Sequence, residues 1–339
     1  MHSGNNTKVI FFMFSGLTEL PILQTALFGI FFPVYIITLV GNAGMILLIR
    51  FSPQLHTPMY FFLSNLAFLD ICYSSSVTPN FLTDLLREKK IISFAGCFVQ
   101  LYFYALFATT EAYLLAMMAY DRYVAICNPL LYSVIMSQRK RIGLVAICYM
   151  AGILNALVHT VAASRLRFCG PNIINSFYCE GPPLFALSCS DTRLNDILMF
   201  VFVGFSVTAT TITVLTSYAY ILITLLRIRG AKNRQKAFST CSSHLMVIFI
   251  FFGCGSFMYS RPSSRQTPEL DKMASVFYVV VTPMLNPLIY SLRNQEVRSA
   301  FRKILENISR YIRIPFCLMI MRITVLIMHE VYIWKIHMA

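Results

Sequence analysis

Long apolar stretches recur along the 339-residue chain, and their length restricts the fold more than any other feature. A helix needs about 20 predominantly apolar residues to cross the hydrocarbon core of a bilayer. We find stretches of this kind at residues 25–49, 59–82, 97–120, 142–163, 197–226, 238–259 and 273–292. The sequence therefore predicts an all-α membrane protein, a seven-transmembrane helix bundle.

Composition agrees with a bilayer environment and excludes most soluble classes. Hydrophobic residues make up 57% of the chain, charged residues 12%, and the mean hydropathy is +0.67. A soluble domain of this size carries far more polar surface. The net charge of +14 does not indicate nucleic-acid binding, because the Lys and Arg residues form short clusters between apolar runs rather than one basic face. The expected partner is the lipid bilayer.

The positions of these cations predict the orientation of the chain. Clusters such as residues 139–141 and 227–236 fall in short loops on one side, and positive loops face the cytosol. The N-terminus is then outside, as expected for a multi-pass protein of the plasma membrane. Residues 1–23 form an extracellular segment that we expect to be retained, because the apolar run at 9–14 is too short for a signal peptide. Asn5 becomes a glycosylation acceptor on the correct side.

Ten cysteines are present, but most lie in or beside the apolar stretches, where packing is their ordinary role. The exceptions are Cys97, at the outer end of the third stretch, and Cys169, Cys179 and Cys189 in the loop before the fifth. These face an oxidising compartment and predict two disulfides. Spacing alone leaves three pairings open for four cysteines.

Two acids lie inside the predicted spans, Asp70 in the second and Glu111 in the third. A charge at bilayer depth costs several kcal/mol, so each acid is a candidate functional residue. Both are expected to face the bundle interior near Asn42 and Asn286. Together they form a candidate sodium site or a pair that shares a proton, and the alternative is a structural polar network that joins helices. No other metal site is expected.

Arg122 stands where the third span leaves the membrane, between Asp121 and Tyr123. It follows Glu111 by eleven residues, about three helical turns, so one helix face runs from the membrane core to the cytosol. An adjacent acid can hold such an arginine in one state and release it in another. The position predicts a two-state switch at the inner end of the bundle.

The seventh span contains Asn286, Pro287 and Tyr290. The proline removes a backbone hydrogen bond, and the asparagine can satisfy part of the opened ladder, which predicts a kink. Beyond the bundle, assigned to residues 24–294, the apolar and basic residues of 295–313 separate onto two faces. We expect a short amphipathic cytoplasmic helix there, followed by an atypical hydrophobic C-terminal extension at 314–339.

Four longer sequence motifs connect these features to a known protein family. They are LHTPMYFFL at 55–63, MAYDRYVAIC at 118–127, KAFSTC at 236–241 and PMLNPLIYS at 283–291. Together they resemble rhodopsin-like G-protein-coupled receptors, and more narrowly olfactory receptors, over about residues 17–305. The resemblance implies a receptor for small, mostly apolar volatile odorants that activates a heterotrimeric G protein with a stimulatory, olfactory-type α subunit and raises cyclic AMP.

The resemblance also implies roles for particular residues. It implies the disulfides Cys97–Cys179 and Cys169–Cys189, a G-protein interface at Arg122, and Asp70 with Glu111 as a buried ionic site. We expect no cofactor, and we expect ligand binding to open the inner face where Arg122, Tyr218 and Tyr290 lie. It places the odorant between the third, fifth, sixth and seventh helices. The residues that line this expected pocket are Tyr104, Ala105, Ala108, Thr109, Phe202, Ser206, Phe252, Gly255, Tyr259, Val276 and Val279.

The chain departs from the family in two places. Phe252 stands where the family usually has a tyrosine, so a hydroxyl associated with activation or ligand contact is missing. The extension at 314–339 runs past the usual family end. Arg322, His329, Glu330 and Lys335 interrupt its apolar run, which predicts an interfacial or disordered segment rather than an eighth span.

Other functions are weaker interpretations of the same residues. An enzyme needs a nucleophile, a base or a metal cluster, and we find no zinc-spaced set, phosphate loop or triad. A channel or transporter would use Asp70 and Glu111 as an ion path, but no inverted repeat or pair of broken helices is evident. A non-olfactory chemosensory receptor for a metabolite would share every feature above, and the tissue of expression would distinguish it.

Overall fold

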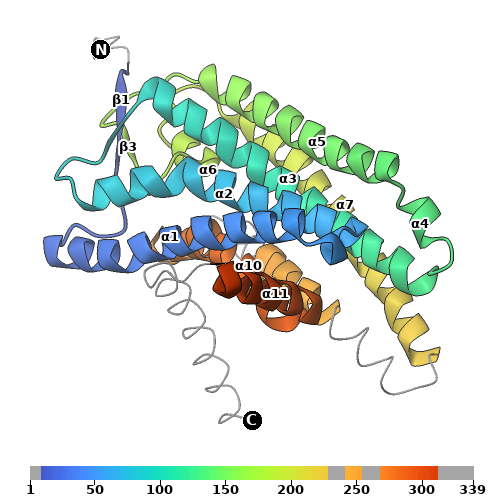
Figure 1. Ribbon diagram of the computed structural model, residues 1–339. Coiled ribbons are helices and arrows are strands. Elements are labelled where there is room, and N and C mark those ends of the chain that lie inside the picture. Colours follow the sequence, from blue (N-terminus) through green and yellow to red (C-terminus); the bar gives the residue numbers. More distant parts are fainter. Residues whose placement is uncertain (1–8, 228–240, 254–267, 312–339) are drawn as a thin grey trace, which may run out of the picture.

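The computed structural model describes residues 9–227, 241–253 and 268–311, and it forms a bundle of long helices (Figure 1). Five described helical stretches are long and apolar enough to cross a membrane. They are α1 (Pro21–Phe51), α3 (Phe94–Cys127), α5 (Gln138–Ser164), α7 (Arg193–Arg227) and the stretch Lys272–Ser291.

The second and sixth predicted spans are also helical where the structure describes them. Helix α2 (Pro58–Leu85) has 28 residues, roughly 42 Å at the usual rise per residue, although its polar residues lower its hydropathy. The sixth span is described over Cys241–Gly253 only. The seventh consists of α9 (Pro268–Val276), the π-helical segment η3 (Phe277–Val281) and α10 (Thr282–Arg293).

Most helices extend beyond the predicted spans, because hydropathy detects the hydrocarbon layer while a helix continues until it is capped. Helix α3 shows this at its start, where the Ser93 hydroxyl accepts a hydrogen bond of 3.0 Å from the Gly96 amide. Such a cap satisfies a backbone donor that has no partner within the helix. The ends of α1, α2, α5 and α7 lie within four residues of the predicted spans, whereas α3 continues seven residues past its predicted end.

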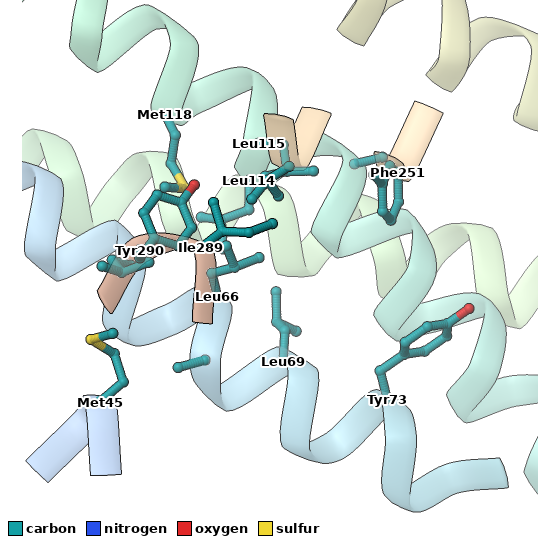
Figure 2. Packing of buried hydrophobic residues seen from close by; sticks show 14 of the residues in the cluster. Met45, Leu66, Leu69, Tyr73, Leu114, Leu115, Met118, Phe251, Ile289 and Tyr290 are labelled. Atoms are coloured by element: carbon teal, nitrogen blue, oxygen red, sulfur yellow. The ribbon is translucent and has the colours of Figure 1, made fainter. Parts of the chain in front are cut away.

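Helix α3 is the central element and packs against α2, α5 and α7, while α1 packs against α2 and α10. Figure 2 shows the resulting core, in which Met45 of α1, Leu66 of α2, Leu114 and Met118 of α3, and Tyr290 of α10 converge. Leu66, Leu114 and Tyr290 are fully buried. Many large apolar side chains on α7, such as Phe200 and Phe205, are by contrast exposed, as expected for a helix with one face toward lipid.

One end of the bundle carries a small sheet that the sequence did not predict. Strand β1 (Phe11–Phe14) lies between β2 (Ile91–Ser93), to which it is antiparallel, and β3 (Ile173–Ile174), to which it is parallel. We call this the strand end. Strands of two to four residues drawn from distant segments leave no detectable period in the sequence. The N-terminal segment is thereby tied to two interhelical loops.

Four further elements complete the described fold, namely η1 (Pro53–Leu55), α4 (Tyr132–Ile135), α6 (Gly181–Phe185) and the longer α11 (Gln295–Tyr311). Helix α11 covers most of the segment for which the sequence predicts an amphipathic helix, and Val297 and Ala300 on it are buried. The bundle end that carries α4, opposite the strand end, is called the α4 end (Figure 1). The predicted extension at 314–339 lies outside the described residues.

Candidate functional site

A cavity of about 200 Å³ lies inside the bundle, between α3, α5, α7, the helix Cys241–Gly253 and η3. Its wall is mostly apolar and aromatic, as in most small-ligand sites. An engineered apolar cavity of about 150 Å³ accepts benzene, so this one suits a molecule somewhat larger than benzene. The lining residues are Leu101, Tyr104, Ala105, Ala108, Thr109, Ala112, Asn155, His159, Gly181, Pro182, Phe185, Met199, Val203, Ser206, Val207, Phe251, Phe252 and Tyr278.

Six of the residues expected at the odorant pocket lie in this wall. Four of them lie on α3, where positions three and four residues apart share a helix face. Ser206 of α7 is placed by a hydrogen bond of 3.2 Å that its hydroxyl accepts from Tyr113. The six are Tyr104, Ala105, Ala108, Thr109, Ser206 and Phe252.

Three expected pocket residues do not line the cavity. Phe202 instead packs edge-on against the His159 ring, with 6.0 Å between ring centroids. Val276 and Val279 are buried in the apolar core. Val276 directly precedes η3 and Val279 lies within it. The π-helical turn changes the angular spacing of side chains there, and Tyr278 of η3 reaches the cavity in their place. Gly255 and Tyr259 lie outside the described residues.

The strand-end wall of the cavity is formed by α6, which the sequence analysis did not predict. The disulfide Cys97–Cys179 joins the first turn of α3 to the residue that precedes Glu180 and α6. Gln100 strengthens this junction, because its Oε1 accepts a hydrogen bond of 2.9 Å from the Cys179 amide. As a result Gly181, Pro182 and Phe185 of α6 close the cavity. A second disulfide joins Cys169 to Cys189 in the same loop.

Glu180 fixes the segment that leads into α6. Its carboxylate is buried and accepts hydrogen bonds from the Ser176 hydroxyl (2.9 Å) and the Tyr178 hydroxyl (2.8 Å). The Tyr178 hydroxyl also lies 3.4 Å from that of Tyr104, a cavity residue of α3. The cavity wall and the loop above it are therefore linked by one polar network.

Two polar residues of α5, Asn155 and His159, are further cavity residues that sequence reasoning missed. The Asn155 side-chain amide donates a hydrogen bond of 2.8 Å to the Thr109 hydroxyl. A usable signal was present, since the two residues are four apart within an apolar span and so share a helix face. The expected pocket was placed between the third, fifth, sixth and seventh helices, and α5, the fourth span, was not among them.

The two membrane acids lie between the cavity and the α4 end. Asp70 is fully buried, and the Asn286 side-chain amide donates to both of its carboxylate oxygens, at 2.9 and 3.1 Å. Asn286 also interacts with Glu111, whose Oε1 has no hydrogen-bond partner among the described residues. Asn42 bonds instead to the Thr38 and Pro283 carbonyls. Within the described chain, no group of three or more His, Cys, Asp or Glu residues is arranged to hold a metal ion.

At the α4 end, Arg122 is paired with its neighbour in the chain. Its Nη2 lies 2.6 Å from Asp121 Oδ2, and the Arg122 side chain is 12% exposed. The other carboxylate oxygen of Asp121 accepts a hydrogen bond of 2.9 Å from the Tyr132 hydroxyl of α4. Burial, together with the nearby Asp121 charge, raises the pKa of Tyr132, so the phenol stays protonated and continues to donate. Asp121 is thus held between two elements.

Contacts between helices close the bundle at this end. The Tyr218 hydroxyl of α7 shares a hydrogen bond of 2.7 Å with His244 Nδ1 on the helix Cys241–Gly253. Tyr123 packs its ring against Tyr220, with 5.6 Å between centroids. Tyr290 is fully buried, and its hydroxyl has no hydrogen-bond partner among the described residues.

Pro287 lies against Gly41 of α1, where an added Cβ would come within 3.2 Å of the proline ring. The proline leaves the Pro283 carbonyl without its helical partner, and Asn42 of α1 donates a hydrogen bond of 3.0 Å to that carbonyl. Asn286, which was expected to satisfy the opened ladder, donates to Asp70 instead. The predicted glycosylation acceptor, Asn5, lies outside the described residues.

The fold is that of a known receptor class. The crystal structure of squid rhodopsin superposes with a TM-score of 0.67 over 88% of this chain and 83% of the squid protein, at 20% sequence identity. Identity at this level shows the fold alone. The bundle therefore has the all-α membrane architecture of rhodopsin-like G-protein-coupled receptors.

Sequence comparison then narrows the class. The olfactory receptor family model matches residues 31–308. Olfactory receptor 5AP2 of Mus musculus is 55% identical over 303 residues, which is 89% of this chain and 96% of the relative. Olfactory receptor 8U3 of Homo sapiens is 51% identical over 303 residues, with 89% and 94% covered. The chain belongs to the olfactory receptor family, and it is a multi-pass membrane receptor rather than an enzyme.

Proposed function

We propose that this receptor binds a small, neutral, mostly apolar odorant in the bundle cavity and activates a stimulatory, olfactory-type G protein, which raises cyclic AMP. The supporting observation is the cavity itself, about 200 Å³ in volume, with walls from the elements that the resemblance implicates. Apolar walls of this kind supply affinity, while a few polar groups fix the orientation of the ligand.

The mechanism we propose is a population shift between a closed and an open α4 end. A ligand that binds the open bundle more tightly raises the fraction of molecules in that state. In the closed state, Asp121 holds Arg122, and Tyr218 is bonded to His244. Opening separates these contacts and presents Arg122, Tyr123, Tyr218 and Tyr290 to the G protein, while Asn286 and Pro287 provide the pivot in the seventh span.

We place the receptor in the plasma membrane with the strand end and the N-terminus outside. The support is the excess of Lys and Arg in the loops on the opposite side. Asn5 is then glycosylated. We expect wild-type receptor to contain a glycosidase-sensitive form that is missing in Asn5→Gln. Surface-stained wild-type receptor without this form would argue against an outer N-terminus that is glycosylated at Asn5.

We further propose that Asp70 and Glu111 hold a sodium ion in the closed state. The support is the unpartnered Glu111 Oε1, buried beside Asn286 and Asp70. A cation that binds one state shifts the equilibrium toward it. We expect sodium, but not choline, to raise the thermal unfolding temperature of the purified receptor, and Glu111→Gln to abolish the effect. An equal sodium effect in the variant would contradict the site.

The main proposal is tested by measuring cyclic AMP in cells that co-express the receptor, its trafficking helpers and an olfactory G protein. The cells are exposed to a chemically broad odorant panel, and surface staining measures receptor expression. We expect a dose-dependent rise with at least one odorant. Arg122→Ala is expected to abolish the response at unchanged surface level and ligand affinity, because it removes the G-protein contact. An undiminished response in Arg122→Ala would refute the role of Arg122, and silence of surface-expressed wild type would refute the coupling.

A further inference from the structure

The α5 wall of the cavity holds two polar atoms that are buried but unbonded. Asn155 is 5% exposed and His159 is 8% exposed. Asn155 Oδ1 and His159 Nε2 have no hydrogen-bond partner among the described residues. Because the Asn155 amide nitrogen donates to Thr109, the oxygen of that amide is the atom left free. Both residues line the cavity.

Unbonded polar atoms at this depth are costly, which marks them as candidate ligand contacts. A buried acceptor or donor without a partner loses its hydration and gains nothing in return. Ser206 and Thr109, which also line the cavity, already take part in hydrogen bonds with Tyr113 and Asn155. The unmet hydrogen-bonding capacity on the α5 wall therefore lies at two neighbouring atoms.

The spacing of these residues lets one ligand atom reach both. Residues four apart on a helix face place their Cβ atoms roughly 5–6 Å apart. Asn155 Oδ1 can only accept a hydrogen bond, whereas a neutral histidine can donate from Nε2. A hydroxyl group is both a donor and an acceptor at one oxygen. We infer that the cavity, in its proposed role as the odorant site, selects small neutral alcohols and phenols, whose hydroxyl donates to Asn155 Oδ1 and accepts from His159 Nε2.

Other ligand classes match this wall less well. Aldehydes, ketones, esters and ethers accept a hydrogen bond but donate none, so Asn155 Oδ1 stays unpaired. Hydrocarbons leave both atoms unpaired. Carboxylates and ammonium ions would bring a charge to a wall whose described lining contains no Asp, Glu, Lys or Arg, and a buried unpaired charge is strongly unfavourable.

The inference is tested by measuring ligand binding to the purified full-length receptor, without any G protein. Binding is measured from the ligand-dependent shift in the thermal unfolding temperature. The probes are two sets matched in non-hydrogen atom count. One set is benzyl alcohol, benzaldehyde and ethylbenzene, and the other is hexan-1-ol, hexanal and heptane. We expect each alcohol to bind about tenfold more tightly than its aldehyde, the effect of one buried hydrogen bond.

Variants locate the effect on the two side chains. Asn155→Leu should remove the preference for alcohol over aldehyde. His159→Phe should weaken the binding of both the alcohol and the aldehyde about tenfold relative to that of the hydrocarbon. Thr160→Val is the matched control, since its hydroxyl is also buried and unbonded on α5 but lies outside the cavity lining. It should leave the ranking unchanged.

Each outcome decides the inference. Equal binding of the three classes, tighter binding of the aldehydes, a preference that persists in Asn155→Leu, or no binding by any probe would overturn it. If a substitution prevents folding, the wild-type ranking remains decisive. Binding of alcohols without a cyclic AMP response would support the hydroxyl site and contradict only the proposed coupling.

Discussion

Gly152 of α5 lies at a point of close contact between α5 and α3. A Cβ added there would overlap the Thr110 side chain and the Leu106 carbonyl oxygen of α3, and backbone cannot move aside cheaply. We expect Gly152→Ala to destabilise the receptor by about 1–3 kcal/mol, the usual effect of overpacking a tight interface. Thermal unfolding of the purified receptor measures this as a lower unfolding temperature.

Gly143 provides the control on the same helix, because no atom would lie within 4 Å of a Cβ added there. Alanine is a better helix former than glycine by about 0.5–1 kcal/mol, so Gly143→Ala should be neutral or slightly stabilising. Equal unfolding temperatures for the two variants would show that α3 and α5 are not in such close contact.

At the scale of single residues, the sequence predicted charged groups better than neutral polar ones. Asp70, Glu111 and Arg122 stand out because a charge in or near a bilayer is costly, and the structure brings Asp70, Glu111 and Asn286 together. Asn155 and a neutral His159 carry no charge, so this signal does not mark them, and both were missed. The hydrogen bond from Tyr132 to Asp121 was also unpredictable, because it depends on how the chain turns after α3.

Among the elements, α7 and the helix Cys241–Gly253 are in contact at the α4 end, and we propose that this contact restrains the closed state. It includes the hydrogen bond between Tyr218 and His244. Loss of one such bond removes about 1 kcal/mol from the closed state, which corresponds to roughly a fivefold change in the open fraction. We expect His244→Phe to raise basal cyclic AMP by about this factor at equal surface level.

A double-mutant cycle separates this bond from other roles of the two residues. If it is the relevant contact, adding Tyr218→Phe to His244→Phe should change basal signalling much less than Tyr218→Phe does in the wild type. Unchanged basal signalling in His244→Phe, or fully additive effects in the double variant, would show that this bond does not restrain the closed state.

Elements with a strong local signal were predicted, and those made by distant pairing were not. Long apolar stretches identify helices such as α1 and α5, because length and composition suffice. The sheet of β1, β2 and β3 depends on segments far apart in the chain, and no local period reveals it. The π-helical segment η3 likewise gave no signal. Val276 and Val279 were assigned to the pocket from the resemblance, and Tyr278 lines the cavity in their place.

At the scale of the whole molecule, the bundle and the location of its cavity followed from the sequence, but the full set of cavity residues did not. Tyr104, Ala105, Ala108 and Thr109 of α3 were predicted from the resemblance, whereas Leu101 and Ala112 of the same helix were missed. The strand-end wall formed by α6 depends on a folded loop, which is fixed by the disulfide Cys97–Cys179 and the buried Glu180. The shape of the cavity thus depends on tertiary contacts that no single stretch of sequence specifies.

The central claim is that a ligand inside this cavity activates the receptor, and filling the cavity tests it most directly. Ala108 lines the cavity, whereas Ala146 on α5 is exposed on the outer face of the bundle. The measurement is odorant-evoked cyclic AMP for Ala108→Phe and Ala146→Phe at matched surface levels. We expect Ala108→Phe to abolish or strongly weaken the response and Ala146→Phe to retain it. A full response in Ala108→Phe would contradict the claim.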